Sequence, residues 1–187
     1  MDDSKLWVVC ASKQPIYFGG TMENELYLCS VDKGYLKYLH GLDYRVSVKY
    51  NNRPFVGIIT MINGIKYVIP LTSQTTQERE KEGKSKRAAR ITTFVRDSAG
   101  VEIADLLYNN MIPITDQYYT LVSVNAEIDT YEANEIRFIR KNKDNITRKA
   151  RKVHDDRMTK HDKFLYKTCC DFSKLEEYYE KYQSTEK

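Results

Sequence analysis

Apolar and polar positions form their clearest pattern around Asn63-Gly64. Two runs rich in β-branched residues flank this dipeptide. Asn-Gly between such runs is the strongest short-range signal for a β-hairpin, because both residues tolerate a positive φ. Proline cannot donate to a strand ladder, so Pro70 predicts the end of the second strand. Thr72 and Ser73 follow it, and a strongly polar segment comes next. We therefore expect a rigid hairpin that presents hydroxyl groups beside a polar loop.

Other parts of the pattern predict further strands and a first helix. Apolar residues at helical spacing follow Asp32. Asp32 or Ser30 would cap this helix, and His40-Gly41 would end it. The segment 74–90 is polar and charged, which favours a loop. We expect short strands at 26–31, 92–95, 101–107, 111–114 and 118–122, and a further extended piece at 46–48.

The C-terminal part of the chain predicts helices. Apolar residues between 136 and 153 recur at three- and four-residue steps, which is typical of one buried helix face. A last helix would have Ser173 as its N-cap and Glu176 as the partner in a capping box. We expect His154 and His161 at the surface, because they lie among basic residues. The order of elements indicates an α+β fold, in which a mostly antiparallel sheet precedes helices.

The composition indicates one globular domain. The chain has 187 residues, of which 41% are hydrophobic. No apolar run reaches the about 18 residues that a membrane span needs, and the N-terminus lacks the pattern of a secretory signal. The four cysteines form no CxxC pair, so we expect neither a zinc site nor a disulfide framework. These features favour a reduced, cytoplasmic protein with no membrane association and no metal cofactor.

Basic residues are concentrated in two blocks. Residues 137–168 contain 12 Lys/Arg and 4 Asp/Glu, and residues 76–96 contain 7 and 3, although the net charge of the chain is only +4. Segregated positive charge favours a polyanionic partner such as nucleic acid. A solvated helix face would give the same pattern, so both interpretations stay open.

The chain lacks the common hydrolytic motifs. It has three histidines and no HExxH, P-loop, dinucleotide-binding glycine or paired-carboxylate motif. The remaining candidates for catalytic groups are hydroxyl, Tyr, Lys and Arg side chains. These suit RNA cleavage, in which the ribose 2′-OH of the substrate is the nucleophile. From the local pattern alone, Thr72 and Ser73 after a strand are more typical of an ordinary turn or helix N-cap.

Six short motifs have an order and spacing found in one known family. They are Tyr35-Leu36-Lys37-Tyr38-Leu39, Phe55-Val56-Gly57-Ile58, Lys66-Tyr67-Val68-Ile69-Pro70-Leu71-Thr72-Ser73, Met111-Ile112-Pro113-Ile114, Phe138-Ile139-Arg140 and Cys170-Asp171-Phe172-Ser173-Lys174-Leu175-Glu176. With these motifs the chain resembles the ToxN/AbiQ-like endoribonuclease toxins of type III toxin–antitoxin systems, from about Glu25 to Tyr182.

The resemblance implies a metal-independent, sequence-selective endoribonuclease that acts by 2′-OH attack and leaves a 2′,3′-cyclic phosphate. It implies cellular or phage RNA as substrate, a tandem-repeat RNA antitoxin as inhibitor in a closed RNA–protein hetero-oligomer, and phage defence by abortive infection. The implied fold is a compact, strongly bent antiparallel sheet flanked by helices, similar to the Kid/MazF toxins. A non-catalytic RNA-binding regulator that uses the same basic helices is the alternative.

The resemblance places the active site at Tyr50, Arg53, Thr72 and Ser73. Ser73 or Tyr50 would position or deprotonate the 2′-OH. Thr72 would bind the phosphate, and Arg53 would stabilise the charge that develops on it. Arginine stays protonated, so it suits charge stabilisation better than proton donation.

One departure from the family concerns the position after the Thr-Ser pair. The family often has a lysine there, whereas this chain has Gln74 and Thr75. Lys81 or Lys84 is expected to substitute. The residues expected to contact RNA are Lys81, Lys84, Lys86, Arg87, Arg140, Arg148, Lys149, Arg151 and Lys152.

Residues 1–21 are expected to be a non-native or disordered extension of a single toxin domain at 22–187. The resemblance begins just after Met22, and codons for Gly19-Gly20 can contain a ribosome-binding sequence at a suitable distance from a start at Met22. A genuine N-terminal strand that includes residues 6–10 is the alternative.

Overall fold

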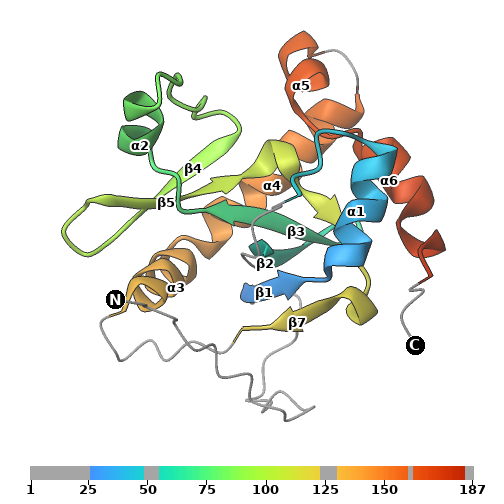
Figure 1. Ribbon diagram of the computed structural model, residues 1–187, viewed down its shortest axis with the longest axis horizontal. Coiled ribbons are helices and arrows are strands. Elements are labelled where there is room, and N and C mark those ends of the chain that lie inside the picture. The colour runs from blue at the N-terminus through green and yellow to red at the C-terminus, as the bar shows by residue number, and fades with distance from the viewer. Residues whose placement is uncertain (1–25, 49–54, 123–129, 160–161, 184–187) are drawn as a thin grey trace.

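The computed structural model describes residues 26–48, 55–122, 130–159 and 162–183, and it has the predicted α+β class with one antiparallel sheet (Figure 1). The strand order is β4-β5-β3-β2-β1-β7, and β6 also pairs with β3. The strands are β1 Tyr27–Val31, β2 Phe55–Ile62, β3 Ile65–Thr72, β4 Thr92–Arg96, β5 Glu102–Leu107, β6 Ile112–Pro113 and β7 Tyr119–Leu121.

Strands β2 and β3 form the predicted hairpin at the centre of the sheet. Asn63 and Gly64 have φ angles of 51° and 83°, the positive values that this turn requires. Gly57 of β2 faces Pro70, and a Cβ atom on Gly57 would lie 2.6 Å from the backbone oxygen of Ile69. Only glycine allows this close approach of the two backbones. The hairpin is therefore a well-defined support for the residues at the end of β3.

The prediction that the second strand ends at Pro70 is wrong. Strand β3 continues to Thr72, and Pro70 is paired with Gly57 of β2. On the opposite edge of β3, β6 pairs as far as Val68 and β5 pairs from Leu71 onwards. Pro70 lies between these two pairings, where that edge forms no ladder, so proline is tolerated inside the strand.

The first helix follows the predicted pattern. Asp32 caps α1 by accepting a hydrogen bond from the backbone N–H of Tyr35 at 2.7 Å. Tyr35, Leu36 and Leu39 are buried. The α-helices are α1 Lys33–Leu42, α2 Thr76–Lys81, α3 Tyr131–Lys141, α4 Lys143–Met158, α5 Lys163–Thr168 and α6 Phe172–Tyr178.

The segment expected to be only a loop contains the short helix α2. The Thr75 side chain accepts a hydrogen bond from the backbone N–H of Glu78, and the Glu78 side chain accepts one from the backbone N–H of Thr75. This reciprocal capping box stabilises a helix that has no buried residue. The Thr-x-x-Glu spacing is the sequence signal that could have predicted it.

The C-terminal helices begin at other residues than predicted. The periodic stretch 136–153 belongs to two helices, α3 and α4, which meet at Asn142. The N-cap of α6 is Asp171 rather than Ser173, because the Asp171 side chain accepts a hydrogen bond from the backbone N–H of Lys174. Ser173 is exposed and lies inside the first turn.

His154 is buried rather than at the surface. It is 3% exposed, and its Nε2 atom lies 2.8 Å from Oε1 of Glu176 on α6. The Tyr67 hydroxyl of β3 donates to the same oxygen at 2.6 Å. Glu176 thus joins α4, α6 and β3 instead of closing a capping box. Burial of an aromatic ring within a periodic helix face outweighed the basic character of the surrounding sequence.

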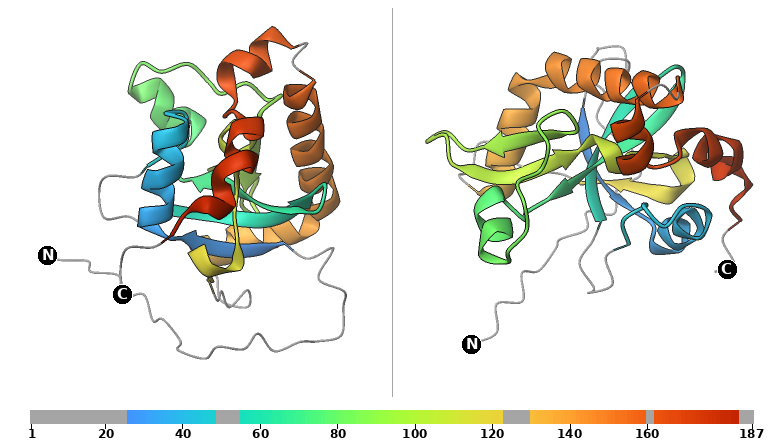
Figure 2. Two further views of the ribbon diagram at one scale, coloured as in Figure 1. Left: turned by 90° about the vertical axis from the view of Figure 1, so that its right-hand side faces the viewer. Right: turned by 90° about the horizontal axis from the view of Figure 1, so that it is seen from above.

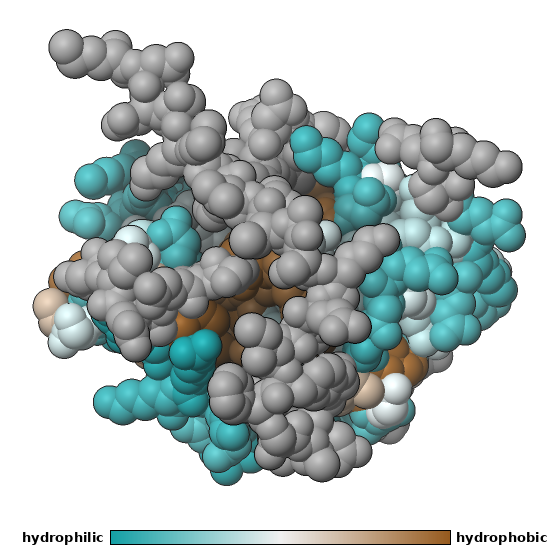
Figure 3. Space-filling view, turned by 90° about the horizontal axis from the view of Figure 1, so that it is seen from below, coloured by the Kyte–Doolittle hydropathy of each residue, from teal (hydrophilic) through white to brown (hydrophobic). Residues whose placement is uncertain are grey.

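The C-terminal end of β3 leads to α2. The left panel of Figure 2 shows α1 and α4 on opposite sides of the molecule, with α6 between them. In Figure 1, α2 and β4 lie on the other side of the molecule from α1 and α6. From below, Figure 3 shows hydrophobic residues in the middle of the face and hydrophilic residues around them. The segment that follows Thr72 is thus remote from the helices that pack around β6.

Some predictions concern residues outside the described ranges. The residues concerned are Tyr50, Arg53, His161 and the extension at 1–21. What the sequence predicts for them stays a prediction. Within the described part of the chain, each helix is too short or too polar to span a bilayer.

Candidate active site

The two predicted hydroxyl residues lie at the end of the central strand. Thr72 is the last residue of β3 and is half-buried, and Ser73 is exposed directly after it. The Thr72 hydroxyl oxygen accepts a hydrogen bond from the backbone N–H of Gln74 at 3.3 Å. Thr72 is also paired with Asp105 of β5. The pairing with β5 therefore holds the backbone of Thr72 in the sheet. The hydrogen bond from Gln74 holds the turn that follows Thr72.

Gln74 joins the segment after Ser73 to two arginines. Its backbone oxygen accepts a hydrogen bond from Nη1 of Arg87 at 2.7 Å. Its side-chain Oε1 accepts from Nη2 of Arg87 at 3.1 Å and from Nη1 of Arg79 at 3.3 Å. Its Nε2 donates to Glu82 at 2.8 Å. Two guanidinium groups thus converge on the residue next to Ser73. The bond from Gln74 Nε2 to Glu82 also ties this residue to the end of α2.

Arg87 is held from the other side by a buried carboxylate. Nη1 of Arg87 lies 2.7 Å from Oδ2 of Asp105, whose side chain is 0% exposed. The Oδ1 atom of Asp105 is buried and has no hydrogen-bond partner among the described residues. Burial raises the pKa of Asp105 to about 6 despite the opposing charge of Arg87. Asp105 therefore orients Arg87 and can also exchange a proton near neutral pH.

Arg79 supplies a second positive charge beside Gln74. Its Nε donates to the backbone oxygen of Ser85 at 2.9 Å, and its Nη1 donates to Gln74. It forms no ion pair within the described ranges, in contrast to Arg87. A half-buried guanidinium of this kind can bind a phosphate oxygen through its remaining N–H groups.

The lysines expected to replace the missing one are placed differently. Lys81 is exposed at the end of α2, and Lys84 is paired with Glu82 at 2.7 Å. Lys86 lies over the ring of Phe94, 4.9 Å from its centroid. Of the described cations between residues 76 and 90, the ones that contact Gln74 are thus Arg79 and Arg87. Sequence reasoning named Arg87 as an RNA contact but missed Arg79.

Asp105 was also missed, although the sequence contained a signal. It lies in the apolar run Ile103-Ala104-Asp105-Leu106-Leu107, and aspartate is almost never fully buried unless it is paired. A lone carboxylate inside a predicted strand is therefore a candidate for a buried ion pair. Its partner was not predictable, because Arg87 lies 18 residues earlier in a polar segment.

Tyr50 and Arg53 cannot be added to this geometry, because they lie outside the described residues. Strand β2 begins at Phe55, and Gly57 of β2 faces Pro70 of β3. The start of β2 and the end of β3 therefore lie at the same end of the sheet. This pairing is the structural reason for keeping both residues as candidates.

The basic residues of α3 and α4 that were expected to contact RNA fall into two groups. The side chains of Arg140, Arg148, Arg151 and Lys152 are exposed. Lys149 is not part of this exposed face. Its Nζ donates to the backbone oxygens of Ala89 and Thr92 at 2.7 and 2.6 Å, and burial lowers its pKa. Lys149 thus fastens α4 to the start of β4.

Metal ligands are not grouped in the described part of the chain. No cluster of three or more His, Cys, Asp or Glu residues suited to a metal ion occurs there. The polar groups at the end of β3 are hydroxyls, guanidinium groups and one buried carboxylate. They can orient a phosphodiester, stabilise added negative charge and hold a proton.

Comparison with known proteins identifies one group of relatives. Residues 27–180 match the family model described as Toxin ToxN, type III toxin-antitoxin system. The chain is 28% identical over 168 residues to Endoribonuclease ToxN of Bacillus thuringiensis subsp. kurstaki, covering 82% of each protein. It is 25% identical over 153 residues to Endoribonuclease AbiQ of Lactococcus lactis subsp. lactis, covering 79% of this chain and 84% of that protein.

Two solved structures have the same fold. One comes from work on selective toxin inhibition by a non-coding RNA pseudoknot in type III systems. It superposes with a TM-score of 0.69 at 27% identity, covering 84% of this chain and 97% of that chain. The other is AbiQ, described as a lactococcal anti-phage endoribonuclease, with a TM-score of 0.69 at 22% identity over the same shares. The resemblance inferred from the sequence motifs is confirmed.

Proposed function

Because this chain belongs to the ToxN family of type III toxin–antitoxin toxins, we propose that it is an endoribonuclease whose active site is the end of β3, at Thr72 and Ser73. The relatives in both sequence comparisons are named endoribonucleases. The observation that carries the site assignment is the convergence of Arg79 and Arg87 on Gln74, the residue next to these hydroxyl groups.

The reaction that suits these groups uses the substrate's own nucleophile. The 2′-OH of one ribose attacks the adjacent phosphorus, the bond from phosphorus to the 5′-oxygen of the next nucleotide breaks, and a 2′,3′-cyclic phosphate forms. The 2′-OH loses a proton and the departing 5′-oxygen gains one, so the reaction balances without water. Positive groups placed where negative charge develops lower the barrier to this step.

The residue roles follow from position and charge. Thr72 is half-buried at the end of a central strand, which suits holding a phosphate oxygen in place. Ser73 is exposed beside it, which suits contact with the 2′-OH. Arg79, which has no ion pair within the described ranges, provides the positive charge that the family's lysine would provide. Tyr50 and Arg53 keep the roles that the family resemblance gives them.

The partners proposed for this chain are RNA molecules. One relative was studied for inhibition by a non-coding RNA pseudoknot, and by analogy a tandem-repeat RNA antitoxin would inhibit this toxin in a closed RNA–protein hetero-oligomer. The exposed residues Arg140, Arg148, Arg151 and Lys152 offer a basic surface for the RNA backbone. The place of action would be the cytoplasm, and the role phage defence by abortive infection.

Single-turnover cleavage separates this function from a non-catalytic RNA-binding regulator. Ser73→Ala should lower the cleavage rate at least about 100-fold, while repeat-RNA affinity stays within about twofold. Ser98→Ala, an exposed serine in the turn between β4 and β5, is the matched control and should cleave normally. Equal cleavage by Ser73→Ala and wild type would refute the site, and no cleavage of any RNA by wild type would favour the regulator.

A further inference from the structure

Arg157, in the last turn of α4, is a buried cation with few partners. Its side chain is 2% exposed, yet its buried Nε atom has no hydrogen-bond partner among the described residues. Its Nη2 atom lies 3.4 Å from Oδ1 of Asp171, and its guanidinium carbon lies 4.6 Å from the ring centroid of Tyr166. A guanidinium has five N–H donors, and buried donors without acceptors are costly. This arginine is therefore a candidate for binding a ligand that accepts hydrogen bonds.

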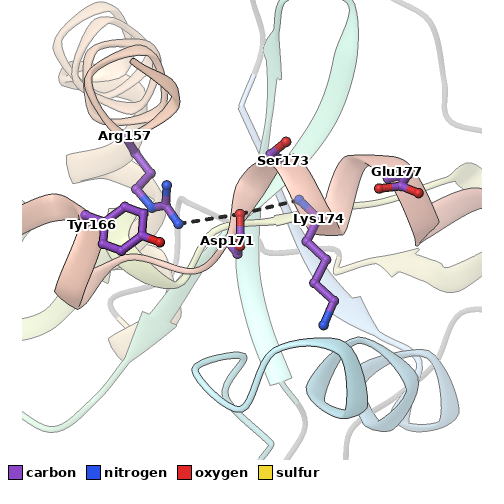
Figure 4. A pocket seen from close by; sticks show the side chains of 6 residues that line it. All are labelled: Arg157, Tyr166, Asp171, Ser173, Lys174 and Glu177. Carbon is purple, nitrogen blue, oxygen red and sulfur yellow. Dashed lines mark hydrogen bonds and ion pairs between the residues drawn. The ribbon is translucent and has the colours of Figure 1, made fainter. Parts of the chain in front are cut away.

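Arg157 lines a cavity of about 200 Å³ between α4, α5 and α6, with Tyr166, Asp171, Ser173, Lys174 and Glu177 (Figure 4). In Figure 4, Arg157 and Tyr166 lie on one side, Asp171 lies in the middle, and Ser173 and Glu177 follow along α6. Tyr166 is 55% exposed although Arg157 lies against its ring. The ring therefore offers apolar surface to a flat ligand.

The mixed charges of this cavity argue against a phosphate group. A phosphate would satisfy Arg157 but would also approach the carboxylates of Asp171 and Glu177, and like charges repel. A ligand that both accepts from a guanidinium and donates to a carboxylate fits better. Guanine presents the N7 and O6 acceptors that arginine recognises and an N2 amino donor. Unstacked RNA bases are commonly read in this way, with the ring stacked on an aromatic side chain.

We propose that the cavity formed by Arg157, Tyr166 and Glu177 binds one unstacked guanine base of an RNA. Arg157 donates to the O6/N7 edge, a carboxylate of Asp171 or Glu177 accepts from the amino group, and the ring stacks on Tyr166. Lys174 is held by the backbone oxygen of Leu42 at 2.6 Å, so it forms part of the wall.

This cavity is separate from the end of β3. Tyr67, which contacts α6 through Glu176, and Thr72 are five residues apart on the same strand, or about 17 Å. An RNA bound at both places would be held at two distant points. This inference rests on the proposed function only in assigning the guanine to an RNA. Binding of the base itself requires no cleavage.

The test is titration of the full chain with guanosine, adenosine, cytidine and uridine 5′-monophosphates by calorimetry or NMR. Guanosine monophosphate should bind about tenfold or more tightly than the other three. Tyr166→Ala should weaken its binding about tenfold, and Tyr166→Phe should not. Glu177→Gln should reduce the preference for guanosine over adenosine monophosphate. Lys163→Ala, exposed on α5 but not lining the cavity, is the control.

Two further measurements make the outcome decisive. Thermal melting of each variant shows whether the fold is kept, and Arg79→Ala shows whether the nucleotide binds at the end of β3 instead. Equal affinity for the four nucleotides would overturn the proposal, as would equal competition by inorganic phosphate. The proposal would also be overturned if guanosine monophosphate binding were lost in Arg79→Ala but kept in Tyr166→Ala. Guanosine binding without RNA cleavage by wild type would leave this proposal standing and refute only the proposed function.

Discussion

The two ends of β3 hold their buried ionisable groups in different ways. At the Tyr67 end, one carboxylate oxygen of Glu176 interacts with both Tyr67 and His154, and the three groups come from three elements. At the other end, Asp105 pairs with Arg87, but one Asp105 oxygen lacks a partner among the described residues. A fully bonded network stabilises a core, whereas a partly satisfied one costs stability. Such a cost is expected where a protein holds groups ready for function.

Removing Arg87 should have the largest effect on the active-site end. Arg87→Ala leaves the buried Asp105 carboxylate unpaired, so we expect a loss of about 3–5 kcal/mol of unfolding free energy. Cleavage should fall about 100-fold, because Gln74 loses the bonds that fix it beside Ser73. Denaturant unfolding and single-turnover cleavage measure the two effects.

A double variant sharpens the comparison. Arg87→Ala combined with Asp105→Ala removes both charges, so most of the lost stability should return while cleavage stays low. If the double variant cleaves at the wild-type rate, the pair does not position the active site.

Breaking the Glu176 network should change stability alone. Glu176→Gln weakens the bonds to His154 and Tyr67, and we expect a loss of about 1–3 kcal/mol of unfolding free energy. The cleavage rate should stay within about twofold of wild type when measured well below the melting temperature, because the network lies about 17 Å from Thr72 along β3. A large loss of cleavage in this folded variant would show that the two ends are coupled.

The two ends should also respond to pH in different windows. Asp105 has a folded-state pKa raised from 3.8 to about 6, so the folded state binds more protons and stability falls as the pH rises between these values. The stability of wild type relative to Asp105→Asn should therefore decrease by on the order of 1–3 kcal/mol from pH 4 to pH 6. Melting curves at closely spaced pH values test this, and a flat difference would contradict it.

His154 provides the matching window at the other end. Its pKa is raised above 6.5: burial lowers it, but hydrogen bonds with Glu176 and Asp155 outweigh that effect. Its stabilising contribution is therefore present below pH 6.5 and is lost as the pH rises through the folded-state pKa. The stability of wild type relative to His154→Gln should decrease above pH 6.5. A decrease confined to the range below pH 6 would contradict the pairing with Glu176.

The smallest effects are expected from the exposed basic face of α4. Replacing Arg148, Arg151 and Lys152 by Ala should lower the salt dependence of RNA binding by roughly 0.7 log–log units for each lost phosphate contact. Lys149→Ala should instead lower the melting temperature, because Lys149 bonds to Ala89 and Thr92. An unchanged salt slope in the triple variant would show that this face is only solvated.

Local signals explain which parts of the fold the sequence predicts. The Asn63-Gly64 turn and the Asp32 cap depend on neighbouring residues, and both were predicted correctly. The predicted strand end at Pro70 was wrong because the pairing on each edge of a strand depends on distant partners. The burial of His154 likewise depends on Glu176, 22 residues away.

The active site shows the same division. Thr72 and Ser73 were identified as candidates from their place after a strand and from the family motif. Arg79 and Asp105 were not, because their roles depend on contacts with Gln74 and Arg87 across the loop and the sheet.

The chemical form of the RNA ends tests the central claim most directly. A short RNA that wild-type protein cleaves should be compared with the same RNA carrying one 2′-deoxynucleotide at the cleaved position, and the fragments weighed by mass spectrometry. Attack by the ribose 2′-OH predicts a 2′,3′-cyclic phosphate on one fragment, a 5′-hydroxyl on the other, and no cleavage of the deoxy substrate. A 5′-phosphate product, or cleavage of the deoxy substrate at the normal rate, would contradict the account.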